Sequence, residues 1–259
     1  MKKLVLIFIP FLLVFLSCEQ SIDTGTDNTL NFSDYNADPS RTGRGGSFAR
    51  FAINGDRLYT VDQNKLRVFN ISDVTNPTFI NKHNVGNNVE TIFPYKENLF
   101  IGTSWGMYIY SISNPDQPRE LSFYRHIFGC DPVVANDEYA FVSIRTGAEA
   151  CQMGSNRVDI VDIRDLTNPI RINTMFRTQP KGVGLQFNEF YLCDNGIWKF
   201  DISNIDDIES TGEKIGQIDA YDVIPFGDYL GVIGNDGFYQ YKNENGQLVE
   251  ISKITIDRQ

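Results

Sequence analysis

A short motif of alternating residue character recurs five times along this chain and constrains its fold more than any other feature. Four copies end in Ile followed by Ser or Arg, and the last copy is degraded. Successive copies start 41, 51, 39 and 41 residues apart, so one unit carries an insertion. A period near forty residues indicates a repeat protein in which each unit is one supersecondary element. The copies occupy residues 66–72, 107–113, 158–164, 197–203 and 238–242.

Three further segments accompany each motif and predict the content of one unit. A second apolar segment and turn residues precede the motif, and a more polar segment follows it, with a candidate at 248–254 in the last unit. Tyr, Phe, Val and Ile dominate these segments, and none has the 3.6-residue periodicity of a helix. Four short antiparallel strands per ~40 residues is the size of a propeller blade. A further apolar segment lies upstream in each unit, at 50–53, 89–93, 132–135, 182–185 and 222–225.

We therefore predict an all-β domain over residues 48–259, a β-propeller of five four-stranded blades. The alternative is an open array of blades stacked without a shared axis. The motif is best kept at 158–162, which reads Val-Asp-Ile-Val-Asp and is followed by Asn168-Pro169. It resembles the LVIVD repeat of exported bacterial and archaeal proteins, and the last unit departs from it at Lys242. The resemblance covers 48–259 and implies a propeller at the cell surface, with no established enzymatic activity.

The first residues have the anatomy of an exported lipoprotein. Lys2 and Lys3 precede an apolar run at 4–16, whose 13 residues cover roughly 20 Å of helix, short of the ~30 Å hydrocarbon core of a membrane. Residues 15–18, Phe-Leu-Ser-Cys, resemble a lipobox, which implies a signal peptide at 1–17 and lipid acylation of Cys18. The alternative is an ordinary signal peptide cut nearby. Residues 18–47 then form the lipidated terminus and a flexible tether, because 19–47 is poor in branched apolar side chains.

The net charge of the chain limits the classes of partner that it can bind. The net charge is −10, and removing 1–17 takes away two lysines, which leaves 21 basic against 33 acidic residues, or −12. Nucleic acid is then excluded as a partner, because phosphate binding needs a concentrated basic face. Direct adsorption to anionic lipid is disfavoured for the same reason. We expect membrane attachment through the lipid alone, at the outer membrane or surface of a Gram-negative envelope, which Glu19 after Cys18 weakly favours.

The three other cysteines are expected to have structural roles. Cys130 opens an innermost strand and Cys151 lies in the insertion, so we predict a Cys130–Cys151 disulfide, with two free thiols as the alternative. Peptide mapping without reductant tests this pairing. Cys193 ends a strand and is expected to be a buried small apolar residue. With only His83 and His126 in the chain, a zinc site or a Cys-His pair is not expected.

The string Gly102-Thr103-Ser104-Trp105-Gly106 matches the G-x-S-x-G pattern of nucleophile elbows. That pattern carries meaning only between a strand and a helix. The repeat places it in a hairpin, so we interpret it as a turn without a catalytic Ser104. An exposed Trp105 at its tip could stack on a sugar or a protein partner.

The candidate ligand-binding residues lie where the innermost strands of the expected propeller begin. There they would surround one mouth of its central channel. Such a cluster could bind a polar ligand, hold calcium through its three acidic members, or form internal ion pairs, the last being the commonest outcome. The residues are Arg50, Glu90, Asp131, Lys181 and Asp222.

We expect a non-enzymatic, cofactor-free and metal-free binding module for a protein or glycan. The alternatives are a metal-assisted hydrolase or lyase that uses the acidic mouth residues, Asp131 above all, or a structural subunit of an envelope complex.

Overall fold

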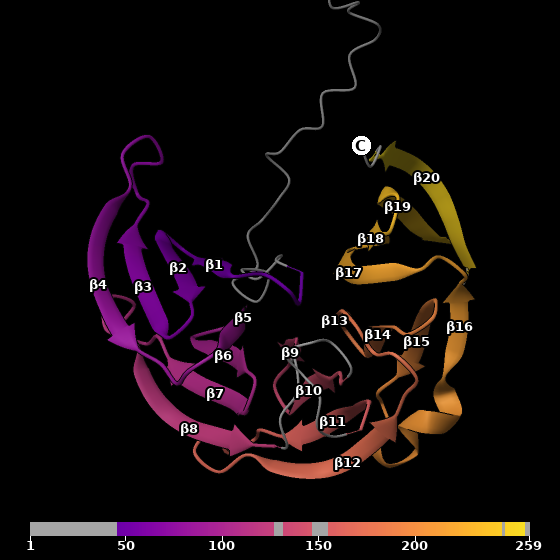
Figure 1. Cartoon of the computed structure of the whole chain (residues 1–259), viewed down its shortest axis with the longest axis horizontal. Helices are drawn as coiled ribbons and strands as arrows, with labels where there is room; N and C mark the ends of the chain where they lie inside the picture. The colour runs from indigo at the N-terminus through magenta and orange to yellow at the C-terminus, as the bar shows by residue number, and fades with distance from the viewer. Residues whose placement is uncertain (1–45, 127–131, 147–154, 245–246, 257–259) are drawn as a thin grey trace, which may run out of the picture. The chain divides into compact units, whose positions relative to one another are not determined.

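Five four-stranded antiparallel sheets make up the described part of the chain (Figure 1). The computed structural model describes residues 46–126, 132–146, 155–244 and 247–256. All the described strands lie within one compact unit, Ala37–Gln259. In the described segments the only helical element is η3, a 3₁₀ helix at Ile205–Thr211, and no helix there is long and apolar enough to cross a membrane. The prediction of an all-β, propeller-like repeat fold is confirmed.

Each sheet follows the order of the sequence. The first contains β1 (Phe51–Asn54), β2 (Arg57–Asp62), β3 (Lys65–Asn70) and β4 (Thr78–Asn84). The second contains β5 (Val89–Tyr95), β6 (Asn98–Thr103), β7 (Gly106–Ser111) and β8 (Arg119–Arg125). The third contains β9 (Val133–Ala135), β10 (Tyr139–Ile144), β11 (Arg157–Asp162) and β12 (Ile170–Phe176). The fourth contains β13 (Val183–Gln186), β14 (Glu189–Cys193), β15 (Ile197–Asp201) and β16 (Glu213–Gly216). The fifth contains β17 (Ala220–Phe226), β18 (Tyr229–Gly234), β19 (Gly237–Glu244) and β20 (Gln247–Thr255).

The recurring motif forms the third strand of every sheet, and a register shift recurs where that strand pairs with the fourth. Such a bulge increases the local twist of a strand pair, and this suits the strong twist of the outer strands of a propeller blade. In four sheets the shift follows the third residue of the motif, as between Val68 and Phe69; in the fourth sheet it follows the first residue. The shifts lie at Val68/Phe69, Ile109/Tyr110, Ile160/Val161, Ile197/Trp198 and Gln240/Tyr241.

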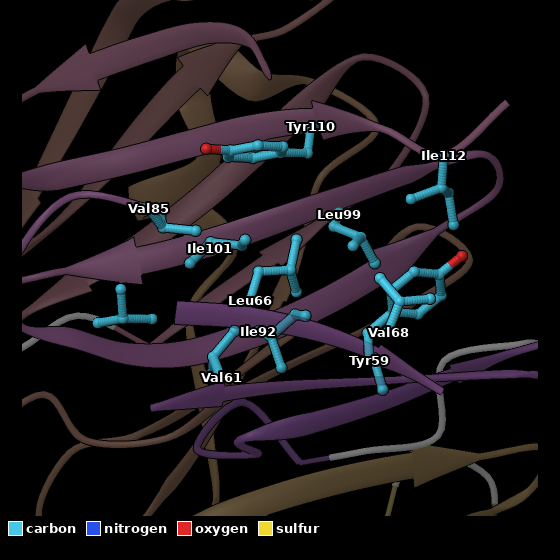
Figure 2. Close-up of a cluster of buried hydrophobic side chains, with 12 residues drawn as sticks. Tyr59, Val61, Leu66, Val68, Val85, Ile92, Leu99, Ile101, Tyr110 and Ile112 are labelled. Atoms are coloured by element: carbon cyan, nitrogen blue, oxygen red, sulfur yellow. The ribbon is translucent and has the colours of Figure 1, made fainter. Parts of the chain in front are cut away.

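The core lies between successive sheets. β1 contacts β5, β5 contacts β9, β9 contacts β13, and β13 contacts β17. Figure 2 shows the cluster between the first two sheets, where Leu66 and Val68 of β3 meet Leu99 and Ile101 of β6. Between the third and fourth sheets, the rings of Phe141 and Phe190 stack with their centres 4.4 Å apart. Each full burial of such a side chain stabilises the fold by ~1.5–3 kcal/mol, so the alternating motif fixes which face each sheet buries.

Candidate ligand-binding site

The innermost strands have two ends with different chemistry, and the end where they begin is closed by contacts within the protein. The hydroxyl of Ser47, just before β1, donates a hydrogen bond to Asp222 Oδ1 of β17 at 2.8 Å. The same hydroxyl accepts the backbone N–H of Val183 of β13 at 2.9 Å. The backbone N–H of Phe48 reaches Asp222 Oδ2 at 3.4 Å. We call this the closed end: the segment that enters the first sheet is bonded to the fourth and fifth sheets.

Asp222 is a buried carboxylate at the closed end. It is 4% exposed, and burial raises its pKa to about 6, although the hydrogen bonds donated by Ser47, Phe48 and Val223 act in the opposite direction. Gly182 leaves no room beside it, because a methyl group there would collide with Asp222 Oδ1. A buried carboxylate with several donors is expected to hold the strands together more than to bind solutes.

Lys181 also has protein partners. Its ammonium pairs with Asp219 Oδ1 at 2.6 Å and lies 4.6 Å from the centre of the Tyr221 ring. Asn235 donates to the other oxygen of Asp219 at 3.0 Å. The Lys181 ammonium, the Asp219 carboxylate, the Tyr221 ring and the Asn235 amide thus form one network near the start of β13 and β17. Like Asp222, Lys181 is buried within the protein.

The other residues expected at this mouth are placed differently. Arg50 is exposed, while Glu90 accepts a hydrogen bond from Ser104 Oγ at 2.9 Å. Asp131 lies outside the described residues. Lys181 lies just before β13, and Asp222 lies in β17, which contacts β13. Ligand binding by the five residues stays a prediction.

The serine and cysteine residues singled out by the sequence offer little reactive chemistry where the structure describes them. Ser104 lies in the turn between β6 and β7, with a strand on both sides, so it has no elbow geometry. Cys193 is fully buried at the end of β14, and burial raises the pKa of its thiol well above the usual value, which disfavours nucleophilic chemistry. Cys18, Cys130 and Cys151 lie outside the described residues. Within the described segments no group of three or more His, Cys, Asp or Glu side chains is placed to hold a metal ion.

The opposite end of the innermost strands, which we call the hairpin end, contains a cavity of about 1000 Å³. The end of β5 and the turns that join the first and second strands of the third to fifth sheets line it, so four repeats contribute to one site. Its lining includes Tyr95, Asn136, Asp137, Glu138, Gln186, Phe187, Asn188, Glu189, Phe226, Asp228, Tyr229 and Asn243.

Acceptor groups and aromatic rings dominate the chemistry of the hairpin end. Four carboxylates line the cavity, and Lys96, beside it, pairs with one of them, Asp137. Lys199 lies 3.6 Å from a second, Glu189, whose other oxygen accepts the Tyr191 hydroxyl. Among the lining residues that the structure describes there is no lysine, arginine or histidine. A ligand rich in hydroxyl or ammonium donors suits such a surface, whereas an anionic ligand does not.

Phe187 at this end adopts a backbone conformation that aromatic residues rarely take. Its φ is +51°, and its side chain is 76% exposed. The corresponding turns of the first and fifth sheets place Gly55 and Gly227 in the same region, at +56° and +65°. A bulky residue there costs of order 1 kcal/mol relative to glycine, so an exposed ring is kept at a site where glycine would be easier.

The hairpin-end site was missed by sequence reasoning. Its residues lie in turns and at the strand ends beside them, where no hydrophobic period marks a site. One signal could have found it: Phe187 occupies a turn position that is glycine in two other repeats, Gly55 and Gly227.

Comparison with known proteins supports the fold. No protein-family model matches the chain, and no curated protein matches it either. Among solved structures, it is similar to a protein from Lactobacillus plantarum, with 14% identity over 78% of this chain and 69% of that one and a TM-score of 0.59. A functionally unknown protein from Desulfotomaculum acetoxidans has 12% identity over 81% of this chain and 70% of its own, with a TM-score of 0.62.

A third similar structure is apo AztD from Citrobacter koseri, with 12% identity, 78% of this chain covered and a TM-score of 0.57. This chain spans 61% of AztD's length, less than two thirds. At such low identity these likenesses define the class alone: a propeller-like protein built from repeated four-stranded sheets.

Proposed function

We propose that this protein is a lipid-anchored binding module of the bacterial envelope, of the LVIVD-repeat type with five blades, that binds a glycan at the hairpin end without catalysing a reaction. The observation that carries the proposal is the cavity of about 1000 Å³ formed by strand ends and turns of four repeats. Ligand sites of proteins are concave, and their volumes commonly fall in the range ~300–1000 Å³. Recognition on loops held by a rigid scaffold is common.

The chemistry of the cavity favours a neutral or amine-bearing sugar. Carboxylates and amide oxygens accept hydrogen bonds from hydroxyl groups, and bonds to a charged acceptor are the stronger ones. The rings of Phe187, Phe226 and Tyr229 offer apolar faces beside these acceptors. A sugar presents both features, because its hydroxyls lie around the ring and its C–H groups on the faces.

Anchoring is the second part of the proposal and has its own support. The basic residues Lys2 and Lys3, the apolar run 4–16 and the Ser17-Cys18 junction indicate export, cleavage and acylation, which would hold the domain at the outer membrane or cell surface. We expect cells fed labelled palmitate to label the wild-type protein and not Cys18→Ala. Equal labelling of both proteins would contradict lipidation at Cys18.

Binding is tested with the full chain purified in a neutral detergent. The protein is applied to an array of neutral, amino and acidic oligosaccharides, and the strongest binder is titrated by calorimetry. We expect a neutral or amino sugar to bind, and Phe187→Gly to weaken it at least about tenfold, since an aromatic face is lost while the turn keeps its preferred backbone.

The matched control is Phe79→Ser, which removes an exposed aromatic ring from the outermost strand β4, away from the cavity. It should bind the sugar as the wild type does. Exclusive binding of acidic sugars, no binding at all, or equal affinities of wild type and Phe187→Gly would each defeat the proposed site. A protein partner recovered through the same surface would replace the glycan in the proposal.

A further inference from the structure

A second cavity, of about 770 Å³, shares no lining residue with the hairpin end. It lies between the outermost strand of the second sheet, β8, and the two outer strands of the third sheet, β11 and β12. Its described lining residues include no acidic residue. They are Tyr124, Arg125, His126, Ser155, Arg157, Arg171, Thr174 and Phe176.

A buried ion pair lies against this cavity. Asp159 is 0% exposed, and its two oxygens accept Nε of Arg157 at 2.9 Å and Nη2 at 3.4 Å. Tyr124 of the second sheet donates to Asp159 at 3.1 Å, and Thr174 donates at 3.1 Å. The acceptor capacity of Asp159 is therefore taken up by Arg157 and two hydroxyls. The Asp159 carboxylate therefore neutralises the charge of Arg157, and its oxygens already accept hydrogen bonds from the surrounding donors.

The remaining two arginines of the cavity add positive charge that this carboxylate does not neutralise. Arg171 is half exposed and its Nη1 lies 3.9 Å from Asp159, beyond hydrogen-bond distance. The guanidinium carbon of Arg125 lies 5.7 Å from the centre of the Phe123 ring, and among the described residues no carboxylate forms an ion pair with it. Counted over the described residues of the site, three arginines and one aspartate leave an excess of two positive charges, in a chain whose net charge is −10.

The repeat shows that this unit is specialised. Asp159 is the second residue of its motif, and the other four copies have Arg67, Tyr108, Trp198 and Tyr239 there. The same unit has the long interval of the repeat. A buried charged pair is costly to form, and apolar residues of similar volume commonly stabilise a fold as well or better. Packing alone therefore gives no reason to place Asp159 and Arg157 where other units manage without them.

We propose that this cavity binds a phosphoryl group, with Arg171 and Arg125 pairing with its oxygens and Asp159 holding Arg157 in place beside them. Guanidinium groups bind phosphate oxygens through paired hydrogen bonds, which makes arginine the preferred residue for such recognition. The exposed ring of Phe176 at the rim offers an apolar surface for any organic group attached to the phosphate. This site is independent of the sugar proposed for the hairpin end.

The test titrates the full chain, in neutral detergent, with inorganic phosphate and with glycerol phosphate, and follows the heat of binding. We expect both probes to bind the wild type, and Arg171→Gln to weaken binding at least about tenfold, because a charge-assisted pair is lost. Arg125→Gln should weaken it in the same direction. Tighter binding of glycerol phosphate would assign a phosphomonoester as the ligand, and equal binding would assign free phosphate.

The matched control is Arg164→Gln, which removes one positive charge beyond the far end of β11, where Arg164 pairs with Asp162. It lowers the net charge by the same amount and should leave the affinity unchanged. Arg171 is half exposed, so its substitution should leave the thermal unfolding midpoint near that of the wild type, which is measured alongside. Failure of both probes to bind the wild type, or equal weakening by Arg171→Gln and Arg164→Gln, would overturn the proposal.

Discussion

The two ends of the innermost strands carry polar residues of similar kinds and use them in opposite ways. At the closed end, Asp222, Ser47 and Lys181 are buried and bonded to partners in other sheets or strands. At the hairpin end, carboxylates and rings such as Glu138 and Phe187 surround a cavity. Both ends are built from the same repeat, yet one end joins the sheets and the other is left accessible.

In this repeat fold, the difference separates polar groups that stabilise the protein from polar groups that are available to a ligand. A polar group that is satisfied within the protein contributes to stability and specificity of packing, and its loss exposes a costly buried partner. A polar group that faces a cavity contributes little to stability and is available for a ligand. Substitutions at the closed end should therefore change the free energy of unfolding, and substitutions at the hairpin end should change binding.

The largest effect is expected from adding one methyl group at the closed end. In Gly182→Ala the new carbon would lie 2.5 Å from Asp222 Cα and 2.6 Å from the carbonyl oxygen of Tyr221, both backbone atoms. The strands must separate, so we expect a loss of about 3 kcal/mol in the free energy of unfolding, measured by urea titration. Gly227→Ala at the hairpin end meets nothing within 4 Å and has only its φ of +65° to disfavour it, which costs about 1 kcal/mol. Equal losses in the two variants would remove the contrast between the ends.

We expect Asp222→Asn to remove a pH-dependent change in the free energy of unfolding of up to about 3 kcal/mol. The pKa of Asp222 rises from 3.8 when unfolded to about 6 when folded, because burial disfavours the charged form. Between these values the folded state binds a proton that the unfolded state has released. The free energy of unfolding therefore falls as the pH rises through this window, by about 1.4 kcal/mol for each pH unit.

The asparagine variant lacks this titration and keeps an oxygen that can accept the Ser47 hydroxyl. Urea unfolding at about pH 4 and pH 7 should therefore show a larger fall for the wild type than for the variant. Other carboxylates titrate in both proteins, so only the difference between them is informative. Parallel stability curves would show that Asp222 is not desolvated.

The smallest effect is expected at the hairpin end. Phe187→Gly relieves the positive φ of this residue, and the greater chain entropy of glycine in the unfolded state offsets part of the gain. We expect the free energy of unfolding in urea to rise by about 0.5 kcal/mol, while sugar binding is weakened. A variant that lost both stability and binding would mean that Phe187 packs into the fold and that the two ends do not differ.

Much of the fold could be predicted because one motif repeats. The upstream segment predicted at 182–185 corresponds to β13, and the segment predicted at 248–254 corresponds to β20. The fourth sheet was harder to predict. No Asn-Pro precedes β16, and η3 lies between β15 and β16, where buried Ile205 and Ile208 pack without a strand pattern. A single short helical element leaves too few residues for a period to be recognised.

The sites were less predictable than the fold, for a physical reason. The equivalent starts of the innermost strands could be located from the repeat, and Lys181 and Asp222 do lie at the starts of the contacting strands β13 and β17. Whether such groups satisfy each other depends on neighbours from other elements, such as Asp219 for Lys181 and Ser47 for Asp222. The arginine cavity depends in the same way on a contact between sheets, Tyr124 with Asp159, that no pattern within one repeat encodes.

The Ser47 contact has a consequence for how the chain acquires its structure. Ser47 is 175 residues from Asp222 and 136 from Val183, so its hydrogen bonds join parts of the chain that are synthesised far apart. Contacts of such large sequence separation form late, because closing a long loop costs entropy before any contact is gained. During synthesis the segment that leads into the first repeat would therefore stay undocked until the fifth repeat had been made, and this segment would then join the first repeat to the last two.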